Sequence, residues 1–210
     1  MAYLRLSPEC SHCGASISWR HPFLELGNGA LIAALWLCCD PGNHIVLYTI
    51  YSSLLILLAV IDMETHRIPR FILYPGWGLA ILGSFAHPSA GFWQLALLGS
   101  MVGSALLFIV HLLGKLFAAA VSRLRGNGIG AVAFGFGDVG LGTLIGLIVG
   151  YPGIAAALLL AVLLGGLTAL TIIFVRAATA RRYTPFKSFA YGPFLVAAAL
   201  MTLLFHSPMR

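Results

Sequence analysis

Two aspartates are the residues of this chain whose type and placement could support chemistry. Asp62 ends a long apolar run, and Asp138 lies in the segment FGFGDVGLG, surrounded by glycines and apolar residues. An ionisable side chain at membrane depth is costly and marks a functional site by default. Two carboxylates brought together share one proton, so one can take a proton from water while the other donates one to a scissile carbonyl. Such acid–base hydrolysis needs no metal or cofactor.

Charge and spacing alone leave other interpretations of these aspartates open. An aspartate at a helix end is often an N-cap or a solvated interfacial group. Glu64, close to Asp62, competes with it for the role of the first carboxylate. The aspartates could also carry protons in a transporter or anchor helices in an assembly factor. A transporter would depend on membrane potential or a pH gradient, whereas a protease would not.

The composition identifies the environment of the chain. Hydrophobic residues make up 60% of the 210 residues and charged residues only 9%, against about 25% charged residues in soluble domains. This predicts an all-α integral membrane protein with lipids as neighbours. The net charge of +6 comes from small basic groups between apolar runs, which is not the continuous basic face of a nucleic-acid-binding protein. No nucleic-acid partner is therefore expected.

Seven apolar runs approach the roughly 20 residues of a membrane-spanning helix. They cover residues 24–39, 45–61, 71–86, 92–114, 129–150, 153–175 and 191–206. Counted from Val139 to Gly150, the fifth would hold only 12 residues, about 18 Å of helix. We therefore expect it to start upstream and bury Asp138, or the membrane to be locally thin. Its glycines, at 135, 137, 140, 142 and 146, favour close helix contact.

The basic residues predict the orientation of the spans. Every Lys and Arg except Arg210 lies in the N-terminal segment or after the second, fourth or sixth apolar run. Because Lys and Arg accumulate on the cytoplasmic side, the N-terminus is predicted to be cytoplasmic and the C-terminus extracytoplasmic. Both aspartates then lie toward the cytoplasm. We expect a cytoplasmic N-terminal segment, residues 1–23, followed by a transmembrane domain, residues 24–210.

Three motifs, in order along the chain, resemble those of the type IV prepilin peptidases, bacterial membrane aspartic proteases of the G-x-G-D class. IDMETHRIPR, from Ile61, looks like the family's first aspartate followed by Ile-Pro. GFGDVGLG, from Gly135, looks like the G-x-G-D segment, and YGPFLVAAA, from Tyr191, is similar to the start of the family's last helix. The resemblance favours Asp62 over Glu64 and implies that Asp62 and Asp138 are catalytic. The implied supporting residues are Gly135, Gly137, Ile68, Pro69, Gly192 and Pro193.

The resemblance also implies a function and a location. It predicts an endopeptidase that removes the basic leader peptide from type IV prepilins or pseudopilins at the cytoplasmic face of the bacterial inner membrane. No cofactor is implied for proteolysis, and no oligomeric state is predicted. The main alternative of the same chemistry is another G-x-G-D membrane protease, such as a presenilin-like protein. In those proteins the first aspartate usually follows a tyrosine, whereas Ile61 precedes Asp62 here.

The N-terminal segment departs from the family pattern. CSHCGASISWRHPFLEL, from Cys10, resembles the family segment that begins with the second of two C-x-x-C pairs. The family's first helix and first pair have no counterpart, and one helix fewer than its eight leaves seven. Cys10 and Cys13 alone cannot fill a four-thiolate zinc site, so at most a partial zinc site is expected and N-methyltransferase activity is predicted to be absent.

The second departure lies beside the second aspartate. Gly140 occupies the position where the family usually has a lysine, two residues after the aspartate. A basic residue there would anchor the segment at the interface or tune the carboxylate. Its absence leaves the predicted pair of aspartates intact.

Overall fold

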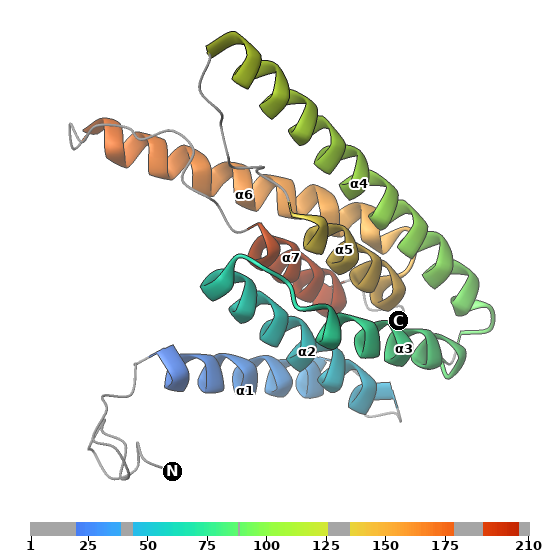
Figure 1. The fold of residues 1–210 in the computed structure, drawn as a ribbon. Helices are drawn as coiled ribbons and strands as arrows, with labels where there is room; N and C mark the ends of the chain where they lie inside the picture. The colour runs from blue at the N-terminus through green and yellow to red at the C-terminus, as the bar shows by residue number, and fades with distance from the viewer. Residues whose placement is uncertain (1–19, 39–43, 88, 126–134, 179–190, 206–210) are drawn as a thin grey trace. The chain divides into compact units, whose positions relative to one another are not determined.

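All regular secondary structure in the described part of the chain is α-helical. The computed structural model describes residues 20–38, 44–87, 89–125, 135–178 and 191–205, which contain seven helices, α1 to α7 (Figure 1). The predicted all-α polytopic fold class is confirmed by these helices and by their apolar character. The chain divides into two compact units, residues 1–53 and 54–210.

The first unit contains α1 (Arg20–Cys38) and the first part of α2 (His44–Thr65). Within it, the Ser53 hydroxyl donates a hydrogen bond to Asn28 Oδ1 at 3.4 Å. The rest of α2 belongs to the second unit. There Leu55 and Leu58 are fully buried, so this part of α2 belongs to the core. Asp62 lies one helical turn after Leu58.

The second unit is built around α5 (Phe136–Val149). Helix α5 contacts α3 (Arg70–Phe85), α4 (Phe92–Arg125), α6 (Gly153–Ala178) and α7 (Gly192–Phe205) (Figure 1). From Asp138 to Val149, every residue of α5 except Thr143 is buried. A short helix surrounded in this way has to present small residues to its neighbours, which explains its glycines.

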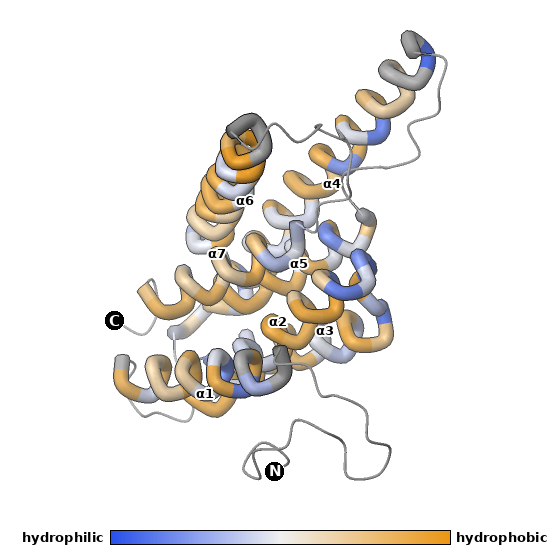
Figure 2. Tube along the Cα trace, turned by 90° about the vertical axis from the view of Figure 1, so that its left-hand side faces the viewer, coloured by the Kyte–Doolittle hydropathy of each residue, from blue (hydrophilic) through white to orange (hydrophobic). Residues whose placement is uncertain are grey.

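Three helical segments are long and apolar enough to cross a membrane: Ile45–Thr65, Phe92–Ala120 and Gly153–Val175. The segments Leu24–Leu37, Phe136–Val149 and Gly192–Phe205 are apolar but shorter. Helices α5, α6 and α7 are mostly hydrophobic along their length, whereas hydrophilic residues interrupt the distal part of α4 (Figure 2). The chain is therefore a multi-pass membrane protein, and its orientation stays a prediction.

The end of α4 and the start of α5 differ most from the sequence prediction. Helix α4 continues past residue 114 to Arg125, because the alanines and other good helix formers that follow extend it. Lys115 and Arg123 therefore lie in a helix rather than in the predicted loop. Helix α5 begins at Phe136 instead of residue 129, since Gly135 has the extended backbone of an N-cap, with φ −78° and ψ 153°.

Glycines bring the backbones of α4 and α5 into contact. A Cβ atom placed on Gly146 would run into the backbone of Gly99, and one on Gly103 would run into the carbonyl group of Gly142. Two pairs of glycines thus face each other across the same interface. Close backbone approach of this kind is a common packing mode of membrane helices.

We expect Gly146→Ala to destabilise the protein, although alanine normally favours a helix over glycine by about 0.5–1 kcal/mol. The new methyl group has backbone rather than a flexible side chain in its way, and such overpacking costs about 1–3 kcal/mol. Gly166→Ala on α6 is the control, because a Cβ there meets nothing within 4 Å. Thermal unfolding in detergent should show a lower midpoint for Gly146→Ala only. Equal midpoints would contradict the α4–α5 contact.

Candidate active site

Asp62 lies in the last turn of α2 and is 5% exposed. Its Oδ2 accepts a hydrogen bond from the backbone N–H of Gly192 at 3.1 Å. Gly192 is the first residue of α7, where backbone N–H groups have no partner within the helix and the helix dipole favours negative charge. Pro193 follows at a position where the lack of an N–H costs nothing. The end of α2 therefore supplies the polar partner for the start of α7.

Asp138 lies in the first turn of α5 and is 7% exposed. Its Oδ2 accepts a hydrogen bond from the N–H of Gly135 at 3.1 Å. This is the reach of a third helical residue back to the N-cap, which ties down the start of a helix. Asp138, like Asp62, is thus held at the positive end of a helix dipole.

The two buried aspartates, far apart in the sequence, are brought together. They lie close enough for the charge of Asp62 to act on Asp138. A buried carboxylate near a second one is harder to ionise than an isolated one, because like charges repel. Glu64, the competing carboxylate, is exposed and lacks the burial that would poise it for this chemistry.

The segment between α2 and α3 packs against the start of α5. Ile68 is 9% exposed, and a Cβ atom on Gly137 would lie 3.0 Å from the Cβ of Ile68. Pro69 is the extended N-cap of α3, and its carbonyl accepts the N–H groups of Ile72 and Leu73 at 3.2 and 3.3 Å. The predicted supporting residues Ile68 and Gly137 therefore touch each other beside Asp138.

Gly140 lies against α3 at a position where an added side chain would require Leu73 to move. The indole Nε1–H of Trp77 donates a hydrogen bond to the Gly140 carbonyl at 3.1 Å. A Cβ atom on Gly140 would run into the end of the Leu73 side chain and would lie 3.5 Å from Trp77 Cζ2. In this chain the glycine allows α3 to pack on α5, and Trp77 links the two helices two residues after Asp138.

No site role was predicted for Tyr191, the first residue of the YGPFLVAAA motif. Tyr191 is half-buried and precedes Gly192, and its carbonyl accepts the N–H of Phe194 at 3.0 Å. Its side chain lies close enough to interact electrostatically with Asp138. Its position directly before the Gly192-Pro193 motif is the sequence signal that could have marked it.

No metal centre is evident in the described ranges, which contain no group of three or more His, Cys, Asp or Glu side chains that could hold an ion. Cys10 and Cys13, the predicted partial zinc site, lie outside these ranges. His111 is 7% exposed, and its ring lies edge-on to that of Phe136, with 6.2 Å between the ring centroids.

A family model described as the type IV leader peptidase family matches residues 49–170, more than half of the chain. This range contains both aspartates and the segment between α2 and α3. It ends before α7, which supplies the hydrogen bond to Asp62.

Individual relatives align with nearly the whole chain. A protein of Burkholderia pseudomallei named prepilin leader peptidase/N-methyltransferase is 31% identical over 99% of this chain, and proteins of the same name from Pseudomonas putida and Bacillus subtilis are 29% and 26% identical. The chain spans 62%, 65% and 74% of these three proteins, respectively. No solved structure matches it.

We expect Gly140→Lys to lower the thermal stability in detergent, because the new side chain collides with Leu73 and displaces α3 from α5. Overpacking of this kind costs about 1–3 kcal/mol. The double variant Leu73→Ala, Gly140→Lys should recover part of the loss, since truncating Leu73 removes the collision. If the effects of the two substitutions on the free energy of unfolding simply add, residues 73 and 140 are not in close contact.

Proposed function

We propose, since the chain belongs to the type IV leader peptidase family, that it is a membrane aspartic endopeptidase that uses Asp62 and Asp138 to remove the basic leader peptide from type IV prepilins or pseudopilins. The observation that carries this proposal is a pair of buried carboxylates, near enough for one charge to act on the other, and each held by a backbone N–H at the start of a helix. The relatives' name adds the substrate class.

The chemistry follows from a dyad that holds one proton. The ionised carboxylate removes a proton from a water molecule, whose oxygen attacks the carbonyl carbon of the scissile peptide bond. The protonated carboxyl group gives its proton to the carbonyl oxygen. The tetrahedral intermediate then collapses: the carboxyl group that took the proton of water gives it to the leaving nitrogen as the C–N bond breaks, and the other carboxylate takes back a proton from a hydroxyl group of the intermediate. The two carboxyls exchange roles during the cycle, so no cofactor is consumed.

The surroundings of the dyad suit a peptide substrate. Gly135 carries no side chain at the start of α5, and only its own segment lies within 4 Å of a Cβ there, so an extended peptide backbone can come close to Asp138. Gly137, in contrast, is covered by Ile68. Leader removal at the junction between a basic leader and an apolar helix requires a site near one face of the membrane. The predicted orientation places the dyad toward the cytoplasmic face of the inner membrane.

The relatives' name also includes N-methyltransferase, and we do not extend that activity to this chain. The predicted lack of methyl transfer rests on the single C-x-x-C pair of Cys10 and Cys13, which lies outside the described residues. It stays a prediction.

Asp62→Asn and Asp138→Asn should each abolish leader removal from a co-expressed prepilin, because an amide can neither accept the proton of water nor share one with its partner. We expect the rate of cleavage to fall at least about a thousandfold, since removing one residue of a catalytic unit costs most of the activity of the whole unit. Glu64→Gln is the matched control, an exposed carboxylate two residues from Asp62. Processing should be compared at equal protein levels.

The same assay in detergent separates the proposal from a transporter function, because cleavage needs neither a membrane potential nor a pH gradient. Residual cleavage by either aspartate variant would show that the carboxylates are wrongly assigned. Wild-type protein that leaves several prepilins intact would overturn the proposed substrate class.

Gly192→Ala should reduce cleavage strongly while the protein still folds. The added methyl would run into the Asp62 carboxylate and separate it from the N–H that holds it. Loss of a hydrogen bond to a charged group costs about 1.5–3 kcal/mol, which corresponds to a rate loss of roughly ten- to a hundredfold. Gly78→Ala is the control, since nothing lies within 4 Å of a Cβ there. Equal cleavage by both variants would exclude a role for the Gly192 contact.

A further inference from the structure

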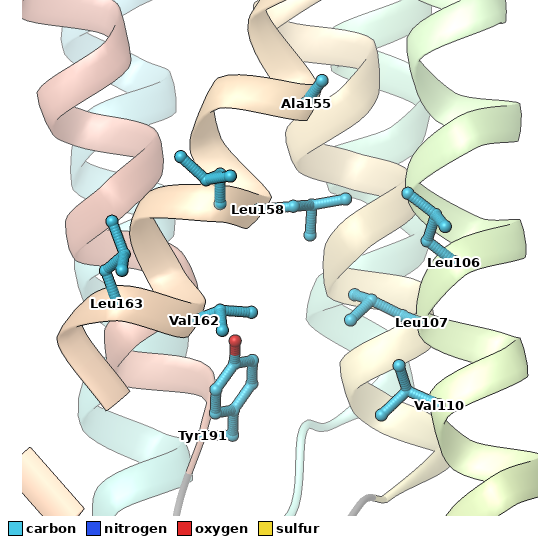
Figure 3. Close-up of a pocket in the computed structure, with 9 residues that line it drawn as sticks. Leu106, Leu107, Val110, Ala155, Leu158, Val162, Leu163 and Tyr191 are labelled. Atoms are coloured by element: carbon cyan, nitrogen blue, oxygen red, sulfur yellow. The ribbon is translucent and has the colours of Figure 1, made fainter. Parts of the chain in front are cut away.

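An apolar cavity lies between α4 and α6, with a volume of about 430 Å³ (Figure 3). Helix α4 contributes Leu106, Leu107 and Val110, and helix α6 contributes Leu158 and Val162. The size is that of a typical ligand pocket, about 300–1,000 Å³. The lining is aliphatic except for one residue, Tyr191.

Tyr191 connects this cavity to the dyad. Its hydroxyl group points into the cavity toward Val162 (Figure 3), and the same side chain lies close enough to interact with Asp138. The ring is seated on α6 at Gly165, where a Cβ atom would be 3.1 Å from Tyr191 Cε2. Tyr191 therefore borders both the cavity and the candidate active site, since the N–H of the next residue, Gly192, holds Asp62.

The cavity is also open to the side of the protein that faces lipid. Val162 is 63% exposed and Leu106 is 46% exposed, and both belong to segments long and apolar enough to span a membrane. An apolar helix in the bilayer could enter from the side without passing through water. A soluble peptide would have no polar partner in the cavity other than the Tyr191 hydroxyl.

We propose that this cavity binds the first turns of the substrate's apolar helix, directly after the scissile bond, and that Tyr191 marks the boundary between the cavity and the dyad. This proposal rests on the proposed function, because it requires a substrate whose cut precedes an apolar segment. From Gly165, which seats Tyr191, to Ala155 at the far end of the lining, α6 rises by about 15 Å. Nearly three helical turns of substrate can pack there through an apolar face.

Ala155→Phe tests the cavity by filling it from an exposed position of α6. Ala156→Phe is the matched control, the neighbouring exposed alanine, which does not line the cavity. We expect Ala155→Phe to raise the KM for a full-length prepilin roughly tenfold, the scale of losing one apolar contact in a pocket, with kcat changed less than about twofold. Ala156→Phe should match wild type. An unchanged KM for Ala155→Phe would mean that only lipid chains occupy the cavity and would overturn the proposal.

A crosslinking experiment gives a readout that does not depend on cleavage. In the Asp138→Asn background, Val162→Cys should form a disulfide with a prepilin that carries one cysteine in the first turns of its apolar helix. Leu167→Cys is the control, since Leu167 is on the same helix and, like Val162, is 63% exposed, but does not line the cavity. Prepilin cleavage by wild type with no selective crosslink at Val162→Cys would overturn the docking proposal alone, whereas absence of wild-type cleavage would overturn the proposed function.

Discussion

A carboxylate buried among apolar helices has to find hydrogen-bond donors, and in this protein the backbone supplies them. Asp62 and Asp138 each accept the N–H of a glycine at the beginning of a helix. Each donor belongs to a group of N–H bonds that α7 or α5 would otherwise leave without a partner. Each carboxylate therefore satisfies an N–H group at the beginning of a helix and is held in place by it. The positions at which α5 and α7 begin thus determine where the candidate dyad lies.

The glycines that surround the dyad act mainly by making room. Gly137 lets Ile68 approach the start of α5, Gly140 lets Leu73 and Trp77 pack against it, and Gly146 allows contact with α4. Packing of this density replaces the hydrophobic driving force that lipid does not provide between membrane helices. The short central helix is thereby fixed from several sides, and Asp138 in its first turn is fixed with it.

Much of this arrangement could be predicted from the sequence. The apolar runs gave seven helices at nearly the observed positions, and the glycine pattern indicated a closely packed fifth helix. The continuation of α4 to Arg125 escaped prediction because hydropathy detects apolar length, whereas alanine-rich polar sequence can remain helical. Tyr191 received no site role because its proximity to Asp138 joins residues distant along the chain. Such pairings depend on how α5, α6 and α7 pack, which local composition does not encode.

The hydrogen bond between Gly192 and Asp62 joins residues 130 positions apart, and this has a consequence for biosynthesis. Asp62 leaves the ribosome long before α7 is made, and at roughly 5–20 residues per second the interval is on the order of ten seconds. During that time the first carboxylate lacks the backbone partner that positions it. The nascent chain thus enters the membrane before the candidate site is complete, and insertion of the last helix supplies the missing hydrogen-bond donor.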